Sequence, residues 1–399
     1  MSLSIIAFKS IMRVGILTLP PLSNYGGILQ AYALQTILQR MGHEACIIVY
    51  KRRYHASFPM WKVPFVYGKR IYMKIVGKYC LPIFYEREYN RVMNCPGEDT
   101  KLFVKKYLKC RFIADFSNIK QTDYDAIIVG SDQVWRPKYF VEPIEMAYLG
   151  FAEKWSRQIK RISYAASFGT DAWEYNRNDS IKCKKLAAAF DAVSVRENSG
   201  KHLCHEHFGI DAEVMPDPTL LLSRADYIGL FREALIPKSS GTLLTYILDE
   251  TKVKMQIIKR VAEEKNIVPF SVNSNYHHAT RLSSENTPPP HTHVRCHTPA
   301  ESLERWLRGF YDADFVITDS FHGCVFSILF NKPFIVIGNY HRGMSRFHSL
   351  LNQFNLRDCL VSEAANEINI PTNWDWENVN RIIEKKTSEA VGFLKRYIK

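Results

Sequence analysis

The chain lacks the cysteine spacings of a metal-binding or disulfide-rich protein. Its nine cysteines are an odd number scattered over 399 residues, and no two of them form a Cys-x-x-Cys pair. This spacing argues against zinc ribbons and thioredoxin-like motifs. The run Cys204-His205-Glu206-His207 contains metal-binding residue types, but neighbouring positions on a helix point in different directions. We therefore predict no metal site, and we expect reduced thiols in a cytoplasmic protein.

Long apolar runs are also missing. No run approaches the roughly 20 residues that span a bilayer. Residues 1–11 carry a short apolar stretch without the basic start, long core and cleavage site of a secretory signal. We treat them as a leader and leave them out of the fold argument.

Acidic residues are absent between Lys51 and Lys78, a segment with eight basic residues and many aromatics. The whole chain carries a formal net charge of +13, which favours an anionic partner. The segment 51–78 indicates either peripheral contact with the inner membrane face or a solvated helical insertion, and we favour the insertion. The sequence contains no recognisable nucleic-acid-binding motif, so we expect no nucleic-acid partner.

What is present is a repeated pattern of apolar strands, each followed by a polar loop and a helix. Residues 13–18, a helix over 28–41 and a strand over 46–50 form a βαβ unit, which requires a parallel sheet. The expected elements that follow are strands at 126–129, 161–166, 192–195, 242–248, 267–272, 314–319 and 333–337, and helices at 199–208, 251–265, 300–311, 323–330 and 376–398. This order predicts an α/β protein with two Rossmann-like domains facing a cleft.

The length and two prolines near residue 217 place the domain boundaries. At 399 residues the chain exceeds what one core usually serves. We predict an N-terminal domain over 1–216, a C-terminal domain over 217–375, and a last helix in 376–399 that packs back on the first domain. The polar segment 273–298 is expected to be a long surface loop.

His322 is the leading catalytic candidate. It follows an apolar strand and precedes a helix, in Ser320-Phe321-His322-Gly323. A helix N-terminus favours an anion, and Gly323 allows close approach. A histidine beside an anion keeps its proton more easily, which suits a general acid or an electrostatic clamp. The alternative is a histidine that only caps the helix, and its position at a strand end favours function.

Arginines also follow strand ends. Arg196 offers a planar fork for a carboxylate or phosphate, or else forms a surface ion pair with Glu197. Arg342 and Arg346 lie in a predicted loop after the strand at 333–337, where they could close over a ligand or remain solvated.

Three further groups of residues stand at predicted loop mouths. Asn24-Tyr25-Gly26-Gly27 is a glycine loop opening onto a helix, with Gln30 one turn later, and could hold a sugar or phosphate. It matches no nucleotide-binding fingerprint. Asp132 and Gln133 could bind hydroxyls, and Asp132 could act as a base. Trp135 is predicted either to stack on a sugar or to pack in the core.

Together these motifs resemble the polysaccharide pyruvyl transferase family. The resemblance covers most of the chain, and its most specific pieces are the runs 129–135, 163–169, 194–197 and 318–323. It implies a fold similar to GT-B glycosyltransferases and no cofactor. It also implies phosphoenolpyruvate as donor and a saccharide or lipid-linked glycan as acceptor, giving a pyruvate ketal in surface polysaccharide biosynthesis. By resemblance, Arg196 and His322 would hold the donor, and Asp132 would bind the acceptor.

One position departs from the pattern of the family. Many members carry an arginine two residues before the histidine, where this chain has Ser320. A donor-binding charge is then missing unless Arg342 or Arg346 replaces it. The competing interpretations are a nucleotide-sugar glycosyltransferase on the same architecture, and a non-catalytic protein that binds anions or glycans.

Overall fold

The computed structural model describes residues 11–22, 24–50, 59–77, 83–84, 87, 98–140, 142–272, 301–338, 343–363 and 370–399. The predicted leader, the predicted loop 273–298 and Arg342 therefore lie largely or wholly outside the described residues. Within the described part of the chain, no helix is long and apolar enough to cross a membrane.

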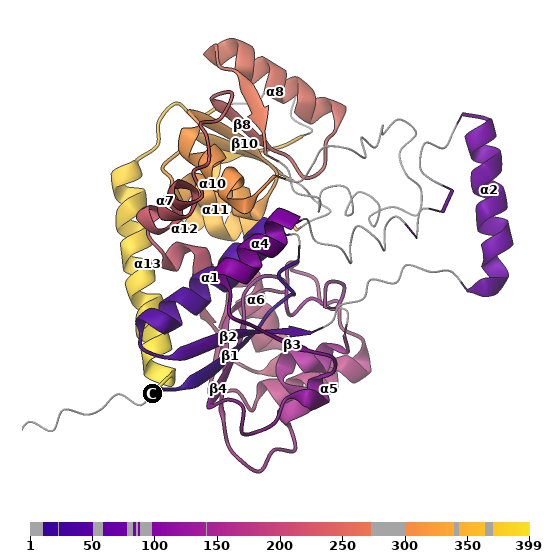
Figure 1. The fold of residues 1–399 in the computed structure, drawn as a ribbon, viewed down its shortest axis with the longest axis vertical. Coiled ribbons are helices and arrows are strands. Elements are labelled where there is room, and N and C mark those ends of the chain that lie inside the picture. The colour runs from indigo at the N-terminus through magenta and orange to yellow at the C-terminus, as the bar shows by residue number, and fades with distance from the viewer. Residues whose placement is uncertain are drawn as a thin grey trace, which may run out of the picture.

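The first half of the chain forms a parallel sheet of seven strands in the order β3-β2-β1-β4-β5-β6-β7 (Figure 1). β4 is apolar and buried along its whole length, as expected for a central strand with helices on both faces. The strands are β1 (Arg13–Leu17), β2 (Glu44–Tyr50), β3 (Cys110–Ile113), β4 (Ala126–Gly130), β5 (Lys160–Ala166), β6 (Ala192–Val195) and β7 (Glu213–Val214). Sequence periodicity missed β3 and β7, which are short edge strands.

The helices of this half are α1 (Tyr25–Arg40), α2 (Val63–Ile75), α4 (Glu98–Tyr107), α5 (Arg177–Ala187) and α6 (Asn198–Leu203), which continues as a π-helical turn over Cys204–Phe208. Helix α1 begins earlier than predicted because the Asn24 side chain accepts a hydrogen bond from the Gly27 N–H and caps it. Gly26 and Gly27 therefore belong to the first helical turn, and the predicted glycine loop is wrong.

The second half forms a parallel sheet of five strands in the order β12-β11-β10-β8-β9. Its strands are β8 (Leu243–Tyr246), β9 (Pro269–Ser271), β10 (Phe315–Thr318), β11 (Phe334–Ile337) and β12 (Leu360–Val361). Its helices are α7 (Arg224–Glu233), α8 (Lys252–Lys265), α10 (Leu303–Asp312), α11 (Phe321–Leu329) and α12 (Ser345–Gln353). Two separate parallel sheets with helices around them confirm the predicted α/β class with two Rossmann-like units.

Helix α13 (Trp376–Tyr397) runs alongside both halves (Figure 1). Thr387 Oγ1 donates a hydrogen bond to the Leu220 carbonyl, and the Phe393 ring lies 6.2 Å from the Tyr164 ring of β5. The chain thus returns to the first sheet at its C-terminal end.

Helix α1 packs between the two sheets. The Tyr25 ring meets Trp306 of α10 edge-on at 5.9 Å, and the Tyr25 hydroxyl donates to the Glu301 carbonyl. At the other end of α1, the Arg40 guanidinium makes two hydrogen bonds to the Asp226 carboxylate of α7. One hydrophobic cluster includes residues of both halves, so the core is continuous across the boundary.

Candidate active site

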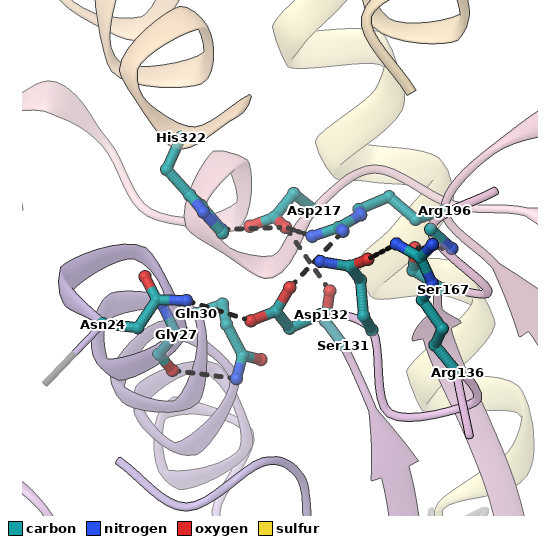
Figure 2. Close-up of polar contacts among 12 residues, drawn as sticks. Asn24, Gly27, Gln30, Ser131, Asp132, Arg136, Ser167, Arg196, Asp217 and His322 are labelled. Atoms are coloured by element: carbon teal, nitrogen blue, oxygen red, sulfur yellow. Dashed lines mark hydrogen bonds and ion pairs between the residues drawn. The ribbon is translucent and has the colours of Figure 1, made fainter. Parts of the chain in front are cut away.

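The carboxyl edge of the first sheet meets the N-terminal ends of α1 and α11 (Figure 2). Asp132 follows β4, Arg196 follows β6, and His322 lies in the first turn of α11. Asp217, just after β7, lies among them. The site is therefore assembled from both halves of the chain, at the sheet edge where ligands bind in open α/β proteins.

Asp217 is the central acid of this site, and it is completely buried. Its Oδ2 accepts a hydrogen bond of 2.8 Å from Arg196 Nη1 and one of 3.4 Å from Ser131 Oγ. Its Oδ1 accepts from the backbone N–H and the hydroxyl of Thr219. Burial alone would raise the pKa of Asp217, yet the nearby His322 and Arg196 hold that pKa well below its usual range. Asp217 is thus a buried carboxylate.

Arg196 is surrounded by three carboxylates. Besides the hydrogen bond to Asp217, its guanidinium lies 3.6 Å from Asp132 Oδ1 and 3.8 Å from Glu197 Oε2. Burial lowers the pKa of Arg196, and these acids outweigh it, so the pKa is raised. Among the described residues, Nε and Nη2 of Arg196 find no hydrogen-bond acceptor. Such buried donors are costly unless a ligand accepts from them.

His322 lies flat against the first turn of α1. A Cβ placed on Gly26 would come within 2.0 Å of the imidazole, so only glycine fits there. His322 Nε2 lies 3.6 Å from Asp217 Oδ2, which is an electrostatic contact beyond hydrogen-bond length. Within the described chain this buried nitrogen has no hydrogen-bond partner. The sequence placed Gly26 in a ligand-binding loop, and the structure places it against the catalytic candidate.

Asp132 occupies a left-handed backbone conformation, with φ of 57°. Aspartate tolerates this region better than most residues, and the Asp132 carbonyl accepts a hydrogen bond from the Ser167 N–H, which holds the turn. Asn24 Nδ2 donates to the Asp132 carboxylate at 3.4 Å. The turn therefore aims the carboxylate between α1 and Arg196, as Figure 2 shows.

Gln30 and Gln133 take part in internal hydrogen bonds. Gln30 Nε2 donates to Thr18 Oγ1 and to the Gly27 carbonyl, both at 2.9 Å, while its Oε1 has no partner in the described structure. Gln133 Oε1 accepts from Arg136 Nη1 at 2.9 Å. Arg136 in turn forms a bidentate pair with Glu174. Gln133 is thus engaged by the protein.

Glu197 organises the loop after β5. Its Oε1 accepts from the Ser167 hydroxyl and from the backbone N–H groups of Phe168 and Gly169, at 2.8, 2.9 and 3.2 Å. Glu197 is buried and holds the loop at the sheet edge. The alternative of a surface ion pair between Arg196 and Glu197 is therefore wrong as to place, because the two side chains lie 3.8 Å apart inside the protein.

Arg346 lies in the first turn of α12, and the prediction that it belongs to a loop is wrong. Its guanidinium lies 5.6 Å from the centre of the Phe321 ring, and that of Arg196 lies 4.3 Å from the same centre. Burial and the neighbouring charge of Arg196 lower the pKa of Arg346 to about 10. A pocket adjoins this pair, lined by Arg196, Glu197, Pro216, Asp217, Leu220, Phe321, Arg346, Leu350 and Gln353.

Ser320 and Gly323 have local roles in α11. The Ser320 hydroxyl accepts from the Gly323 N–H and caps the helix. A Cβ on Gly323 would come within 2.2 Å of Thr318 Oγ1, so this glycine allows the helix to approach β10. Trp135 is fully buried and donates to the Ala147 carbonyl, which settles its alternatives in favour of core packing.

The structure brings together six of the predicted residues: His322, Arg196, Asp132, Asn24, Gly26 and Arg346. Tyr25 points instead into the contact with α10. Sequence reasoning missed Asp217, which it had treated as part of a proline-rich joint between domains. No group of three or more metal-binding side chains occurs among the described residues.

The family model of polysaccharide pyruvyl transferases matches residues 24–341. The chain belongs to this family, and it is a transferase. No curated protein matches the chain.

Solved structures resemble the chain over nearly its whole length, but at low identity. UGT89C1 of Arabidopsis thaliana, complexed with UDP-L-rhamnose, is 8% identical with a TM-score of 0.46, covering 97% of this chain and 98% of the other. UDP-GlcNAc 2-epimerase of Neisseria meningitidis, bound to UDP-GlcNAc, is 10% identical with a TM-score of 0.45, covering 97% and 99%. The S. aureus MnaA–UDP co-structure is 11% identical with a TM-score of 0.46, covering 94% and 88%. Since these scores lie below 0.5, the chain's own two sheets define its fold.

Proposed function

We propose that the protein transfers the pyruvyl group of phosphoenolpyruvate to two hydroxyls of a saccharide, forming a cyclic ketal and releasing phosphate. The observation that carries the proposal is the meeting of Arg196, Arg346 and His322 around Phe321 in a pyruvyl transferase. Phosphoenolpyruvate carries a carboxylate and a phosphate. Two guanidinium groups and an imidazole are suitable partners for that pair of anions.

Asp217 and one oxygen of Glu197 are compatible with an anionic donor near Arg196 because protein donors already engage them. Both oxygens of Asp217 accept hydrogen bonds from protein donors, and Glu197 Oε1 accepts three. The remaining donors, Nε and Nη2 of Arg196, have no hydrogen-bond acceptor among the described residues, so they could donate to an oxygen of the ligand. The carboxylates fix the orientation of Arg196, and the donor would complete its hydrogen bonds.

The proposed chemistry starts with a proton. Protonation of the methylene carbon of phosphoenolpyruvate makes its C2 electron-poor, and one saccharide hydroxyl adds there. The C2–O bond to phosphate then breaks, and a second hydroxyl adds to the resulting cation and closes the ring. The two hydroxyls lose two protons in all: the methyl carbon gains one and the released phosphate takes the other.

The side chains divide this work by their positions. His322 Nε2 lies 3.6 Å from the carboxylate of Asp217, and we assign the imidazole the role of the acid that protonates the methylene carbon. Asp132 accepts a hydrogen bond from Asn24 and lies 3.6 Å from Arg196, and we assign it the role of accepting a hydroxyl proton from the acceptor. Asp217 acts through Arg196 and His322, and we assign it a positioning role.

Isothermal titration of the full chain with phosphoenolpyruvate and with a panel of UDP-sugars tests the donor. We expect binding of phosphoenolpyruvate, and phosphate release once a lipid-linked or free saccharide acceptor is supplied. Binding of a UDP-sugar alone would overturn the proposal in favour of a glycosyltransferase. Binding of phosphoenolpyruvate without phosphate release on any acceptor would indicate a non-catalytic relative.

A further inference from the structure

Helix α2 and the short 3₁₀ turn before it, Met60–Lys62, stand apart from both sheets (Figure 1). No residue of this pair of elements is buried. In the described structure α2 packs on Phe84, whose ring lies 5.2 Å from the Tyr67 ring, and Arg70 donates to the Ile83 carbonyl at 3.0 Å. One side of the helix therefore has a partner within the chain.

The other side of α2 is apolar and faces outward. At about 100° per residue, Phe65, Ile71, Tyr72 and Ile75 fall on one side of the helix. Their exposed fractions are 75%, 44%, 64% and 79%, and Trp61 just before the helix is 68% exposed. The less exposed residues Val63, Val66, Tyr67, Arg70 and Met73 fall on the opposite side. A helix solvated by water shows polar residues outward, so this pattern is inverted.

A basic residue borders the apolar face. Lys69 lies about 40° round the helix from Phe65, whereas Lys74 falls among the less exposed residues of the opposite side, and both lysine side chains are exposed. The whole segment from Lys51 to Lys78 contains eight basic residues and no acidic one. An outward apolar face with aromatic residues and a bordering lysine is the pattern of helices that lie in a membrane interface.

We propose that α2 docks the protein onto an anionic lipid bilayer, with Phe65, Tyr72 and Ile75 entering the boundary between head groups and acyl chains. The charge pattern favours lipid over a second copy of the chain. Two copies would bring together two segments that carry positive charges and no negative ones, and these would repel each other. Nucleic acid would use the lysines and leave the apolar face in water. Delivery of a lipid-linked saccharide to the site rests on the proposed function, whereas the docking itself does not.

Sedimentation of the full chain with vesicles tests the docking. One set of vesicles is phosphatidylcholine, and the other contains phosphatidylglycerol as well. We expect binding to the anionic vesicles, weakened by salt because surface charges are screened. The double variant F65S/I75S should partition at least about tenfold less, since each buried CH₂ group contributes to binding. The K69Q variant should lose roughly fivefold, and K74Q, whose lysine lies on the opposite side of the helix, should lose less.

The matched control is I181S/L235S, which removes two exposed apolar side chains elsewhere on the surface. It should bind vesicles as the wild type does, and all variants should keep the wild-type melting temperature because none of these side chains is buried. Absence of binding to anionic vesicles at low salt, or wild-type binding by F65S/I75S, would overturn the proposal. Sedimentation velocity without lipid tests whether a second copy of the chain binds this face instead. An oligomer of the wild type that dissociates in F65S/I75S would assign the apolar face to a second copy.

Discussion

Two buried ion clusters lie at strand ends in this protein, and they differ in how completely their polar atoms are paired. In the C-terminal half, Lys254 donates to Asp319 and to the Asp249 carbonyl, both at 2.8 Å, and Asp319 also accepts from two backbone N–H groups. Around Arg196, four polar atoms lack a hydrogen bond among the described residues: Nε and Nη2 of Arg196, Oε2 of Glu197 and Nε2 of His322.

The difference separates a structural cluster from a candidate site. Lys254 and Asp319 tie the start of α8 and the loop after β8 to the end of β10, and every charge is used inside the protein. Burial raises the pKa of Asp319 in spite of the neighbouring Lys254. Unpaired buried donors around Arg196 instead indicate a place where a ligand completes the hydrogen bonds.

The largest expected effect is the loss of catalysis in H322Q. Glutamine keeps a polar side chain but carries no proton that it can give to carbon, so phosphate release should fall roughly 10²- to 10⁴-fold. The unfolding free energy should also fall, because His322 is one of the two groups that hold the pKa of the buried Asp217 low, so the rate is measured on protein that urea unfolding shows to be folded. The exposed His348, on the neighbouring helix α12, gives the control H348Q, which should keep the wild-type rate. A normal rate in H322Q would remove His322 from the reaction.

The K254M variant should instead lose stability, by about 3–5 kcal/mol, because it leaves Asp319 buried without its cation. Urea unfolding measures this loss. The double variant K254M/D319L removes both charges and should regain most of it. Titration with phosphoenolpyruvate should give the wild-type affinity for the folded K254M protein. If K254M bound phosphoenolpyruvate more weakly without losing stability, the Lys254–Asp319 cluster would belong to the donor site, and the distinction between the two clusters would be wrong.

Asp217 belongs to the candidate site and also stabilises the fold, and the pH dependence of unfolding measures its contribution to stability. Its folded pKa lies below the unfolded value of about 3.9, so its charge stabilises the fold above that pH. The contribution disappears as pH falls through the folded pKa. D217N should therefore be less stable than the wild type at pH 7, by about 3 kcal/mol, because Arg196 loses its closest partner.

Urea unfolding at pH 7, 5 and 4 checks the sign. The gap in unfolding free energy between the wild type and D217N should be constant between pH 7 and 5 and begin to narrow near pH 4. D217E, which keeps the charge, should retain most of the stability and lose rate through displaced side chains. A gap that widens on acidification would contradict a buried, charged Asp217.

Much of the fold was predictable from the sequence, because apolar runs such as 126–129 and 314–319 become the central strands of the two sheets. The edge strands β3 and β12 were not, since they have few residues and partly exposed faces. The predicted strand ends also indicated that Asp132, Arg196 and His322 follow strands β4, β6 and β10.

What the sequence could not show is which side chains meet across the two halves. Asp217 sits in a Pro-Asp-Pro run that reads as a linker, and only the packing of η6 (Pro218–Leu221) against α1 brings it to Arg196. The contact between Gly26 and His322 likewise joins positions 296 residues apart (322 − 26). Pairings at such separation depend on the assembled core.

A substitution of Arg346 has the smallest expected effect, and it tests whether the buried cations near Arg196 bind the donor. Ser320 stands where the family resemblance predicts an arginine, and its hydroxyl caps α11, so a second cation of the proposed donor site would come from another element. Arg346 reaches the same Phe321 ring as Arg196 from α12. Lysine keeps the charge but loses the planar fork, so R346K should bind phosphoenolpyruvate about five- to tenfold more weakly in calorimetric titration. The exposed Arg357 supplies the control R357K, which should bind normally. Unchanged affinity in R346K would mean that the donor anion is held by Arg196 and His322 without a second guanidinium.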